Sequence, residues 1–201
     1  MKAQSRFVAL GLLLTLPVVS IGCRTSATSD DVAVLETNYG RIIIEFLPQD
    51  APKNVANFIE LTRDGFYDGT KFHRIVGKAP KIVAIQGGDP NTISGDPSTW
   101  GQGQPGQRTV QAEFSKSLKH VRGIVSMARR GNDENSATSQ FFICVAPESQ
   151  WDGKYTIFGR VADGLNIVDS IARAPTWPNS DRPMDPVLIT KATIQKRGDI
   201  K

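Results

Sequence analysis

Arginine, glutamine and aromatic side chains stand in four of five short apolar blocks of this sequence. The five blocks are residues 72–76, 86–89, 123–128, 139–144 and 151–159, and only 123–128 has none of these residue types. Arg74 is a donor with a permanent charge, and Gln86 and Gln140 each offer a donor and an acceptor. Phe142 offers apolar area that can bury a ring or an aliphatic side chain. Such a set can bind a polypeptide backbone and stabilise developing charge without forming a covalent bond.

Residues suited to metal, nucleophilic or acid–base chemistry are few. The chain has two histidines, His73 and His120, with no metal-ligand spacing and no strong nucleophile–base motif. Cys144 lies in an apolar run, where a buried and inert thiol is expected rather than a reactive one. The sequence therefore predicts neither a metal nor a cofactor.

The five blocks, in this order, resemble the cyclophilin family of peptidyl-prolyl cis-trans isomerases. The resemblance extends from Val32 to Ile194, which is nearly the whole chain after its leader. It implies a mainly β fold, a closed eight-stranded antiparallel β-barrel capped by two α-helices. It also implies catalysis of rotation about X-Pro bonds, for which amide resonance sets a barrier of roughly 18–20 kcal/mol.

Arg74 is the predicted catalytic residue. As the amide twists, its nitrogen regains lone-pair character, and a guanidinium can donate to that nitrogen or to the prolyl carbonyl oxygen. Loss of one preorganised donor of this kind costs about 2.7–4 kcal/mol in other enzymes. A surface arginine in an ordinary strand is the alternative. His73 is expected to be a structural partner and Phe72 a core residue.

The resemblance places substrate-binding residues around Arg74. Gln86 would lie beside it, and Gln140 would bind substrate backbone. Phe141 and Phe142 must diverge in a strand, so one ring enters the core while the other faces the substrate. The resemblance assigns the substrate-facing ring to Phe142. Core packing of both rings is the alternative.

By the same resemblance, Ala128 and Arg129 form an edge for the residue before proline, and Trp151 and Tyr155 close the pocket. Counted without gaps, Gln150 falls where many cyclophilins have tryptophan, and Trp151 falls on the neighbouring leucine position. A shift of one residue would make Trp151 the usual tryptophan, and both alignments stay open. Tyr155 stands where well-studied eukaryotic members have histidine, so its role is a substitution.

The segment before Gln86 departs from the family pattern. Relatives commonly have a tight turn followed by Phe-Met, whereas residues 76–85 form a longer segment with Val83 and Ala84 at those two positions. The pocket is therefore expected to be shallower. At about 25 cal/mol per Å², the lost apolar area costs about a kcal/mol of transition-state binding. Lower activity, or an altered preference for the residue before proline, would follow.

Short strands and few helices must position these residues. Alternating apolar residues predict strands over 32–36 and 41–47, joined by a tight turn with Asn38 and Gly40. Three apolar residues of the second strand would share one face, namely Ile42, Ile44 and Phe46. Ile43 would point to the other face. A last strand is predicted over 186–194.

A helix is predicted to start at Asp50, which would cap it, with Pro52 in the first turn and Gly65 at its end. Its buried stripe would consist of Val55, Phe58, Ile59 and Thr62. Residues 89–111 are rich in Gly, Pro, Gln, Ser and Asp, which is typical of a long surface loop.

The net charge of +4 is small for a chain of 201 residues. Clustered basic residues invite a nucleic-acid interpretation, and they are Lys116, Lys119, His120, Arg122, Arg129 and Arg130. Apolar residues separate them and no aromatic platform alternates with them, so a solvated edge is favoured and nucleic acid is not an expected partner. Composition and length predict one domain, expected to be a monomer.

The first residues are typical of an export signal. Lys2 and Arg6 precede an apolar run over 7–19, which is too short for a comfortable transmembrane helix. We interpret residues 1–22 as a lipoprotein-type signal peptide and Cys23 as the lipidated residue, although Ser20 departs from the usual lipobox. An ordinary signal peptide, or an uncleaved anchor, is the alternative.

These assignments divide the chain into a signal peptide, a lipidated tether over 23–31 and an isomerase domain over 32–201. The predicted location is outside the cytoplasm, as a membrane-anchored lipoprotein facing the periplasm or the cell exterior. The expected partners are X-Pro-containing polypeptides, a cyclosporin-type inhibitor and the membrane.

The leading hypothesis is a prolyl isomerase that assists folding of exported proteins. A low-activity chaperone or scaffold that binds peptides on the same barrel is the second hypothesis. A hollow, ligand-holding barrel of the lipocalin type is the third.

Overall fold

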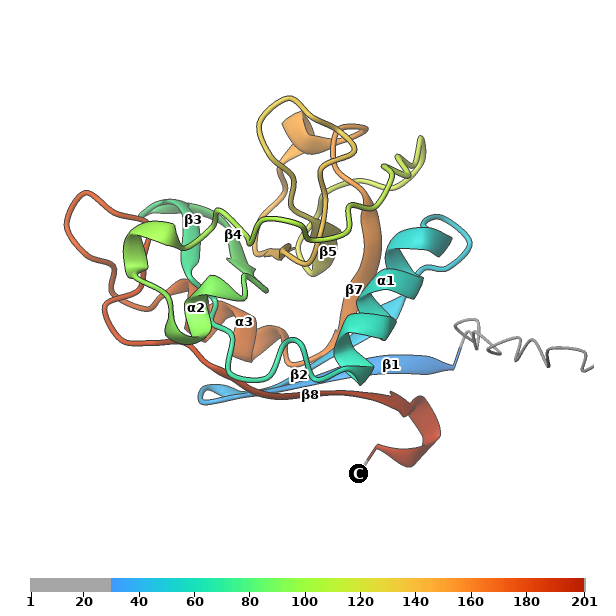
Figure 1. Cartoon of the computed structure of the whole chain (residues 1–201), viewed down its shortest axis with the longest axis horizontal. Coiled ribbons are helices and arrows are strands. Elements are labelled where there is room, and N and C mark those ends of the chain that lie inside the picture. The colour runs from blue at the N-terminus through green and yellow to red at the C-terminus, as the bar shows by residue number, and fades with distance from the viewer. Residues whose placement is uncertain (1–29, 201) are drawn as a thin grey trace, which may run out of the picture.

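The computed structural model describes residues 30–200, in which eight antiparallel strands form one curled sheet (Figure 1). The ladder order is β3-β4-β6-β5-β7-β2-β1-β8. The strands are β1 (Asp31–Thr37), β2 (Gly40–Phe46), β3 (Arg74–Lys78), β4 (Lys81–Gly87), β5 (Ile124–Met127), β6 (Phe141–Cys144), β7 (Ile157–Asp163) and β8 (Ile189–Lys196). The predicted mainly β class is confirmed, and the predicted signal peptide and Cys23 lie outside the described residues.

The two edges of the sheet meet through the segments that precede the edge strands. Lys71 and Leu188 form an isolated antiparallel bridge. Next to it, Phe72 N donates to Val187 O over 2.9 Å. The predicted eight strands are therefore present, but a short bridge joins β3 and β8 where a fully closed barrel would have a continuous ladder.

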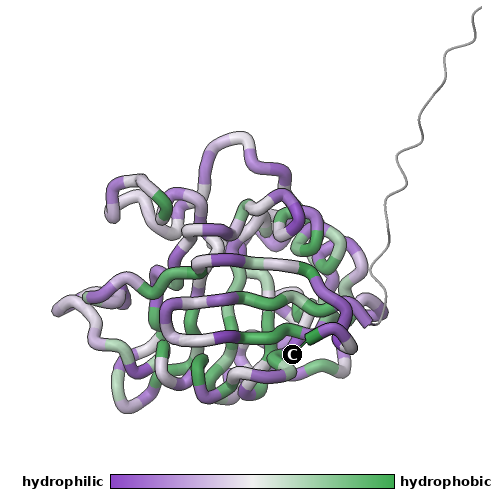
Figure 2. Tube along the Cα trace, turned by 90° about the horizontal axis from the view of Figure 1, so that it is seen from below, coloured by the Kyte–Doolittle hydropathy of each residue, from purple (hydrophilic) through white to green (hydrophobic). Residues whose placement is uncertain are grey.

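The β1–β2 hairpin forms as predicted. Gly40 adopts a φ of +130°, which favours glycine, and Val34 pairs with Ile43 across the ladder. The alternate residues Ile42, Ile44 and Phe46 pack in the main core. Ile43 packs on the other face with Val32 and Val34. Figure 2 shows apolar segments along the central strands and polar residues in many of the turns and outer loops.

In the part of the chain that the structure describes, three α-helices and three 3-10 helices accompany the sheet. They are α1 (Pro52–Arg63), α2 (Asn91–Ser94), η1 (Pro97–Thr99), η2 (Ser149–Trp151), α3 (Leu165–Ala172) and η3 (Arg197–Asp199). The two longer helices contact different strands: α1 contacts β7 and β8, whereas α3 contacts β2 and β4. The loop predicted over 89–111 contains α2 and η1.

Helix α1 ends at Arg63, and Gly65 just beyond it adopts the predicted left-handed conformation with a φ of +71°, but the start of the helix is capped differently. Asp50 makes no capping hydrogen bond, because Ala51 is the N-cap and its side chain has no acceptor. Glu113, from a distant loop, accepts hydrogen bonds from Lys53 N at 3.1 Å and from Asn54 N at 3.0 Å. The predicted cap was therefore wrong, and a carboxylate far along the chain satisfies the exposed N–H groups instead.

The predicted stripe of α1 lies in the core. Phe58 packs against Tyr67, Phe158 and Phe141, with ring centroids 4.8, 5.1 and 5.4 Å away. Phe141 is fully buried here, while Phe142 belongs to a separate cluster. The two rings therefore diverge as the strand period predicts, and the packed interior argues against a hollow, ligand-holding barrel.

Across residues 30–200, no helix has the length and apolar character that crossing a bilayer requires.

Candidate active site

The central predicted site residues form one row across three neighbouring strands. Arg74 of β3 pairs with Gln86 of β4, and Gln86 pairs with Phe142 of β6. Ser126 of β5 is the next partner in the row. Directly paired residues share one face of a sheet, and neighbouring strands lie about 4.8 Å apart. The backbones at Arg74 and Phe142 are therefore separated by about two strand spacings on the same face.

The aromatic half of the site surrounds Phe142, which is 5% exposed. Trp151 and Tyr155 meet its ring edge-on, with centroids 4.9 and 5.5 Å away. Ala84 is buried in the same cluster, and Ala128 packs against it. The structure thus brings four predicted pocket residues to Phe142, and it does so through packing rather than hydrogen bonding.

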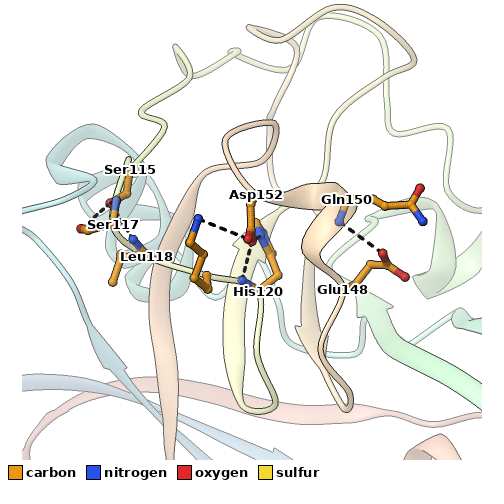
Figure 3. A network of polar contacts seen from close by, with 8 residues as sticks. Ser115, Ser117, Leu118, His120, Glu148, Gln150 and Asp152 are labelled. Atoms are coloured by element: carbon orange, nitrogen blue, oxygen red, sulfur yellow. Dashed lines mark hydrogen bonds and ion pairs between the residues drawn. The ribbon is translucent and has the colours of Figure 1, made fainter.

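His120 lies behind this aromatic group and was not predicted as a site residue. Its ring stacks on Phe142 at 6.0 Å, and its Nδ1 lies 3.1 Å from Asp152 Oδ1 (Figure 3). Its Nε2 lies 3.0 Å from Ser126 Oγ. A neutral imidazole that donates from Nδ1 must accept at Nε2, so the Ser126 hydroxyl donates.

The order Ser126–His120–Asp152 has the connectivity of a hydrolase triad, but its burial argues against that chemistry. Ser126 is fully buried, so a substrate carbonyl has no path to its hydroxyl. Burial also lowers the pKa of His120 below its ordinary value, although the hydrogen bond to Asp152 acts in the opposite direction. The three residues therefore fix the wall behind Phe142.

The polar half of the site surrounds Arg74. Its Nε donates to Asp181 Oδ2 over 3.0 Å, and the Arg74 side chain is 49% exposed. The same aspartate accepts a hydrogen bond at its backbone oxygen from Ile75 N, at 2.7 Å. A recess of about 410 Å³ opens here, lined by Arg74, Gln86, Trp100 and Asp181 among others. Phe142 does not line this recess.

Glutamine side chains connect the two halves. Gln86 Nε2 donates to Gln140 Oε1 over 3.0 Å, and Gln140 Nε2 donates to Gly101 O over 3.0 Å. A second recess, which Gln86 also lines, is formed by Ala128, Arg129 and Gln140 among others. Each glutamine is thus held by a neighbour at the position where substrate backbone is predicted to bind.

Arg129 reaches the aromatic half rather than standing alone at an edge. Its guanidinium carbon lies 4.8 Å from the centre of the Tyr155 ring, and its Nε donates to Lys154 O over 3.0 Å. A guanidinium over an aromatic face is attracted by the ring quadrupole. Tyr155 thereby links Arg129 to Phe142.

Two predictions about neighbouring residues have different outcomes. Trp151 packs on Phe142, while Gln150 is exposed and its backbone N–H donates to Glu148 Oε1 (Figure 3). Trp151 therefore lies on the Phe142 side of the site, whichever of the two alignments is correct. Val83 is buried but is not one of the residues that pack with Phe142. Only Ala84 of that pair joins the cluster, because successive side chains of a strand point to opposite faces.

The remaining titratable groups favour non-covalent chemistry. Burial raises the pKa of the Cys144 thiol to about 12, which keeps it protonated and inert, as predicted. Among residues 30–200, no group of three histidine, cysteine or carboxylate side chains is placed to hold a metal ion. Together, the geometry offers a cationic donor, two side-chain amides and an aromatic wall.

Comparison with known proteins gives the family. The chain matches the family described as "Cyclophilin type peptidyl-prolyl cis-trans isomerase/CLD" over residues 32–194. It is 44% identical over 160 residues to human peptidyl-prolyl cis-trans isomerase-like 1, covering 79% of this chain and 89% of that protein. It is 43% identical over 160 residues to peptidyl-prolyl cis-trans isomerase ppi1 of Schizosaccharomyces pombe, covering 79% and 95%.

Comparison with solved structures gives the same family. A cyclophilin-type isomerase of Cryptosporidium parvum, crystallised in the presence of the dipeptide Ala-Pro, matches with a TM-score of 0.71 and 32% identity, covering 82% of this chain and 99% of that one. The cyclophilin AquaCyp293 from Hirschia baltica matches with a TM-score of 0.66 and 25% identity, covering 94% and 83%. The eight-stranded curled sheet is thus the cyclophilin fold, and this chain belongs to the cyclophilin-type peptidyl-prolyl cis-trans isomerases.

Proposed function

We propose that this protein isomerises X-Pro bonds of exported polypeptides, with Arg74 as the catalytic donor and the Phe142 group as the proline-binding wall. One observation carries the assignment of residues: the register that sets Arg74, Gln86 and Phe142 in one row on one face of the sheet. A guanidinium and an aromatic ring about two strand spacings apart can flank a proline and its neighbours.

The proposed mechanism requires only positioning and electrostatics. The apolar wall holds the proline ring, and the amides of Gln86 and Gln140 bind the flanking backbone. As the X-Pro amide twists, Arg74 donates a hydrogen bond to the prolyl carbonyl oxygen or to the amide nitrogen. The hydrogen bond to Asp181 uses Nε of Arg74, which leaves the two terminal nitrogens to donate to the substrate.

The test is an assay of cis-trans isomerisation on a short X-Pro peptide. The protein should accelerate the reaction, and Arg74→Ala should lower kcat/KM by about 100- to 1,000-fold. Arg74→Lys is the matched control, because it keeps the charge but loses the planar donor fork, and it should recover only part of the loss. A cyclosporin-type inhibitor, as a third arm, should compete with the peptide.

Two results would contradict this proposal. An Arg74→Ala variant with unchanged kcat/KM would remove Arg74 from the mechanism. No acceleration at any concentration of the protein would exclude catalysis itself and favour the second hypothesis, a chaperone or scaffold that binds Pro-containing chains. The low exposure of Phe142 behind Trp151 is the observation that favours this alternative. Peptide binding that persists without measurable isomerisation would support the chaperone or scaffold.

The export and the lipid anchor are proposed from the sequence, and they rest on residues 1–22 and Cys23. If they are correct, radioactive palmitate should label the protein in cells, and the label should disappear in a Cys23→Ala variant. Cys144→Ala is the matched control, since its buried thiol should not be acylated. Labelling that survives Cys23→Ala, or a protein that stays in the cytoplasm, would overturn the proposed location.

A further inference from the structure

A groove of about 750 Å³ lies beside the candidate active site and outside it. One wall is the turn between β3 and β4, which belongs to the lengthened segment before Gln86. The other wall begins at the end of α3 with Ala172 and continues along the following segment to Ser180. The extra residues thus extend the β3–β4 hairpin and build a wall, in addition to any effect on the proline pocket.

The surface of this groove is mostly apolar. Trp177 lines it and is 45% exposed, whereas tryptophan side chains in proteins are mostly buried on average. Ile82 and Pro80 line the opposite side. Exposed tryptophan is enriched at the centres of binding sites, where it buries a large area with little loss of entropy.

Both charged residues that line the groove are cations. Lys78 projects from the end of β3 and Arg173 from the end of α3, and both are exposed. A ligand that combines apolar side chains with carboxylates would complement this surface. A basic or purely polar ligand would not.

The groove continues the series of recesses that crosses the active site. The recess at Ala128 and the recess at Arg74 share Gln86 and Gly101. The recess at Arg74 and the groove share Ser180. Arg182 connects them further, because its guanidinium carbon lies 5.6 Å from the Trp100 ring centre and 5.9 Å from that of Trp177.

We infer that this groove is an extended substrate subsite, which binds an apolar, acidic stretch of the same polypeptide whose proline occupies the active site. The inference rests on the proposed function and deepens it. The direction of the chain follows from the mechanism. Of the two acceptors proposed for Arg74, the prolyl carbonyl oxygen belongs to the peptide bond that leads to the residues after proline. The stretch that reaches the groove from Arg74 therefore follows the proline.

The experiment compares peptides that share one X-Pro core. The first ends shortly after proline. The second continues for eight residues with apolar side chains and two glutamates, which can span about 26 Å. The third replaces the glutamates with lysines, and the fourth places the acidic stretch before the proline. The second should show a KM about tenfold below the others, with little change in kcat.

Substitutions in the groove then locate this effect. Trp177→Ala should raise the KM of the acidic peptide about fivefold. The pair Lys78→Glu and Arg173→Glu should reverse the preference between the glutamate and lysine peptides at low salt. Two exposed residues outside the groove provide matched controls, Ile93→Ala and Lys116→Glu, and neither should change the preference.

The outcomes separate the inference from the proposed function. Every groove variant should isomerise the short peptide at the wild-type rate, so a lost rate there would mean damage to the active site. An equal KM for all four peptides, or a gain only when the acidic stretch precedes proline, would overturn the inference while leaving catalysis intact. If the short peptide is not isomerised at all, the proposed function fails. Calorimetric binding of the acidic peptide then tests the groove alone.

Discussion

The two halves of the candidate active site are held in place in different ways. On the aromatic side, Phe142 is 5% exposed and is enclosed by Trp151, Tyr155 and His120. On the polar side, the Arg74 side chain is 49% exposed and is oriented by one ion pair with Asp181. Packing and buried hydrogen bonds fix the first half, whereas a solvent-exposed contact from a loop orients the second.

This difference separates stability from activity. Removal of a buried ring leaves a cavity, and the cost falls on the folded state. Exposed ion pairs contribute little to stability, because water screens them and their side chains lose entropy. Substitutions on the aromatic side should therefore change both folding and catalysis, and those on the polar side should change catalysis almost alone.

The largest expected effect is on stability, and it follows a substitution on the aromatic side. Phe142→Ala should lower the free energy of unfolding by about 3–5 kcal/mol, because its neighbours cannot fill the space. Denaturant unfolding monitored by circular dichroism measures this loss. Phe142→Leu, which keeps most of the apolar volume, should cost less and preserve part of the activity.

Arg74→Ala provides the contrast in the same unfolding experiment. Its free energy of unfolding should lie within about 0.5 kcal/mol of wild type, since the Arg74 side chain is half exposed and its one ion pair is open to solvent. If Phe142→Ala lowered the free energy of unfolding as little as Arg74→Ala, packing would not be what holds the aromatic side in place, and the two halves would not differ in this way.

Strand periodicity explains how much of this arrangement the sequence could predict. The alternation of apolar residues correctly placed Ile42 and Ile43 on opposite faces, and it separated Phe141 from Phe142. The resemblance supplied the strand count. Residues that reach the site from regular strands were therefore accessible from sequence alone.

Contacts made by irregular segments were not accessible. Asp181 meets Arg74 across 107 positions, and Glu113 meets Lys53 across 60. Neither pairing follows a period, because the path of the loop decides which side chains meet. In the sequence, His120 stands out only as one of two histidines and as part of a basic stretch. The fold buries it against Asp152 and Phe142, which come from segments distant in the sequence. The sequence offers one local signal, a histidine next to an apolar block.

The dependence of stability on pH should distinguish the two halves further. Burial lowers the pKa of His120 and of His73. Below their unfolded pKa of about 6.5, the unfolded chain therefore binds protons that the folded chain does not. The free energy of unfolding should fall as pH drops from about 6.5 toward 5, by at most about 1.4 kcal/mol per pH unit for each histidine.

Substitution identifies which half of the site responds. His120→Gln, on the aromatic side, should remove part of the change in the free energy of unfolding with pH. His73→Gln, next to Arg74 on the polar side, should remove the other part. Unfolding curves at several pH values between 5 and 7 measure both slopes. The lowered pKa of Asp152 concerns a more acidic range, near and below pH 4, and should not contribute. Slopes that survive both substitutions would show that neither buried histidine is responsible.

The smallest expected effect concerns Asp181, which holds the polar side. Asp181→Ala should leave the free energy of unfolding within about 1 kcal/mol of wild type, because the ion pair is exposed. It should lower kcat/KM about two- to fivefold, with the change mainly in kcat, since Arg74 would sample more orientations. Asp181→Glu should recover part of the rate.

Asp169→Ala is the matched control for this last substitution. Asp169 pairs with Arg122 over 2.6 Å, and its side chain is 31% exposed, against 30% for Asp181. It lies on α3 and lines none of the recesses described above, so its loss should cost a similar small stability and no rate. If Asp181→Ala instead raised kcat/KM, the ion pair would be restraining Arg74 rather than positioning it. The polar side would then be regulated by its loop, whereas the aromatic side would remain fixed by its packing.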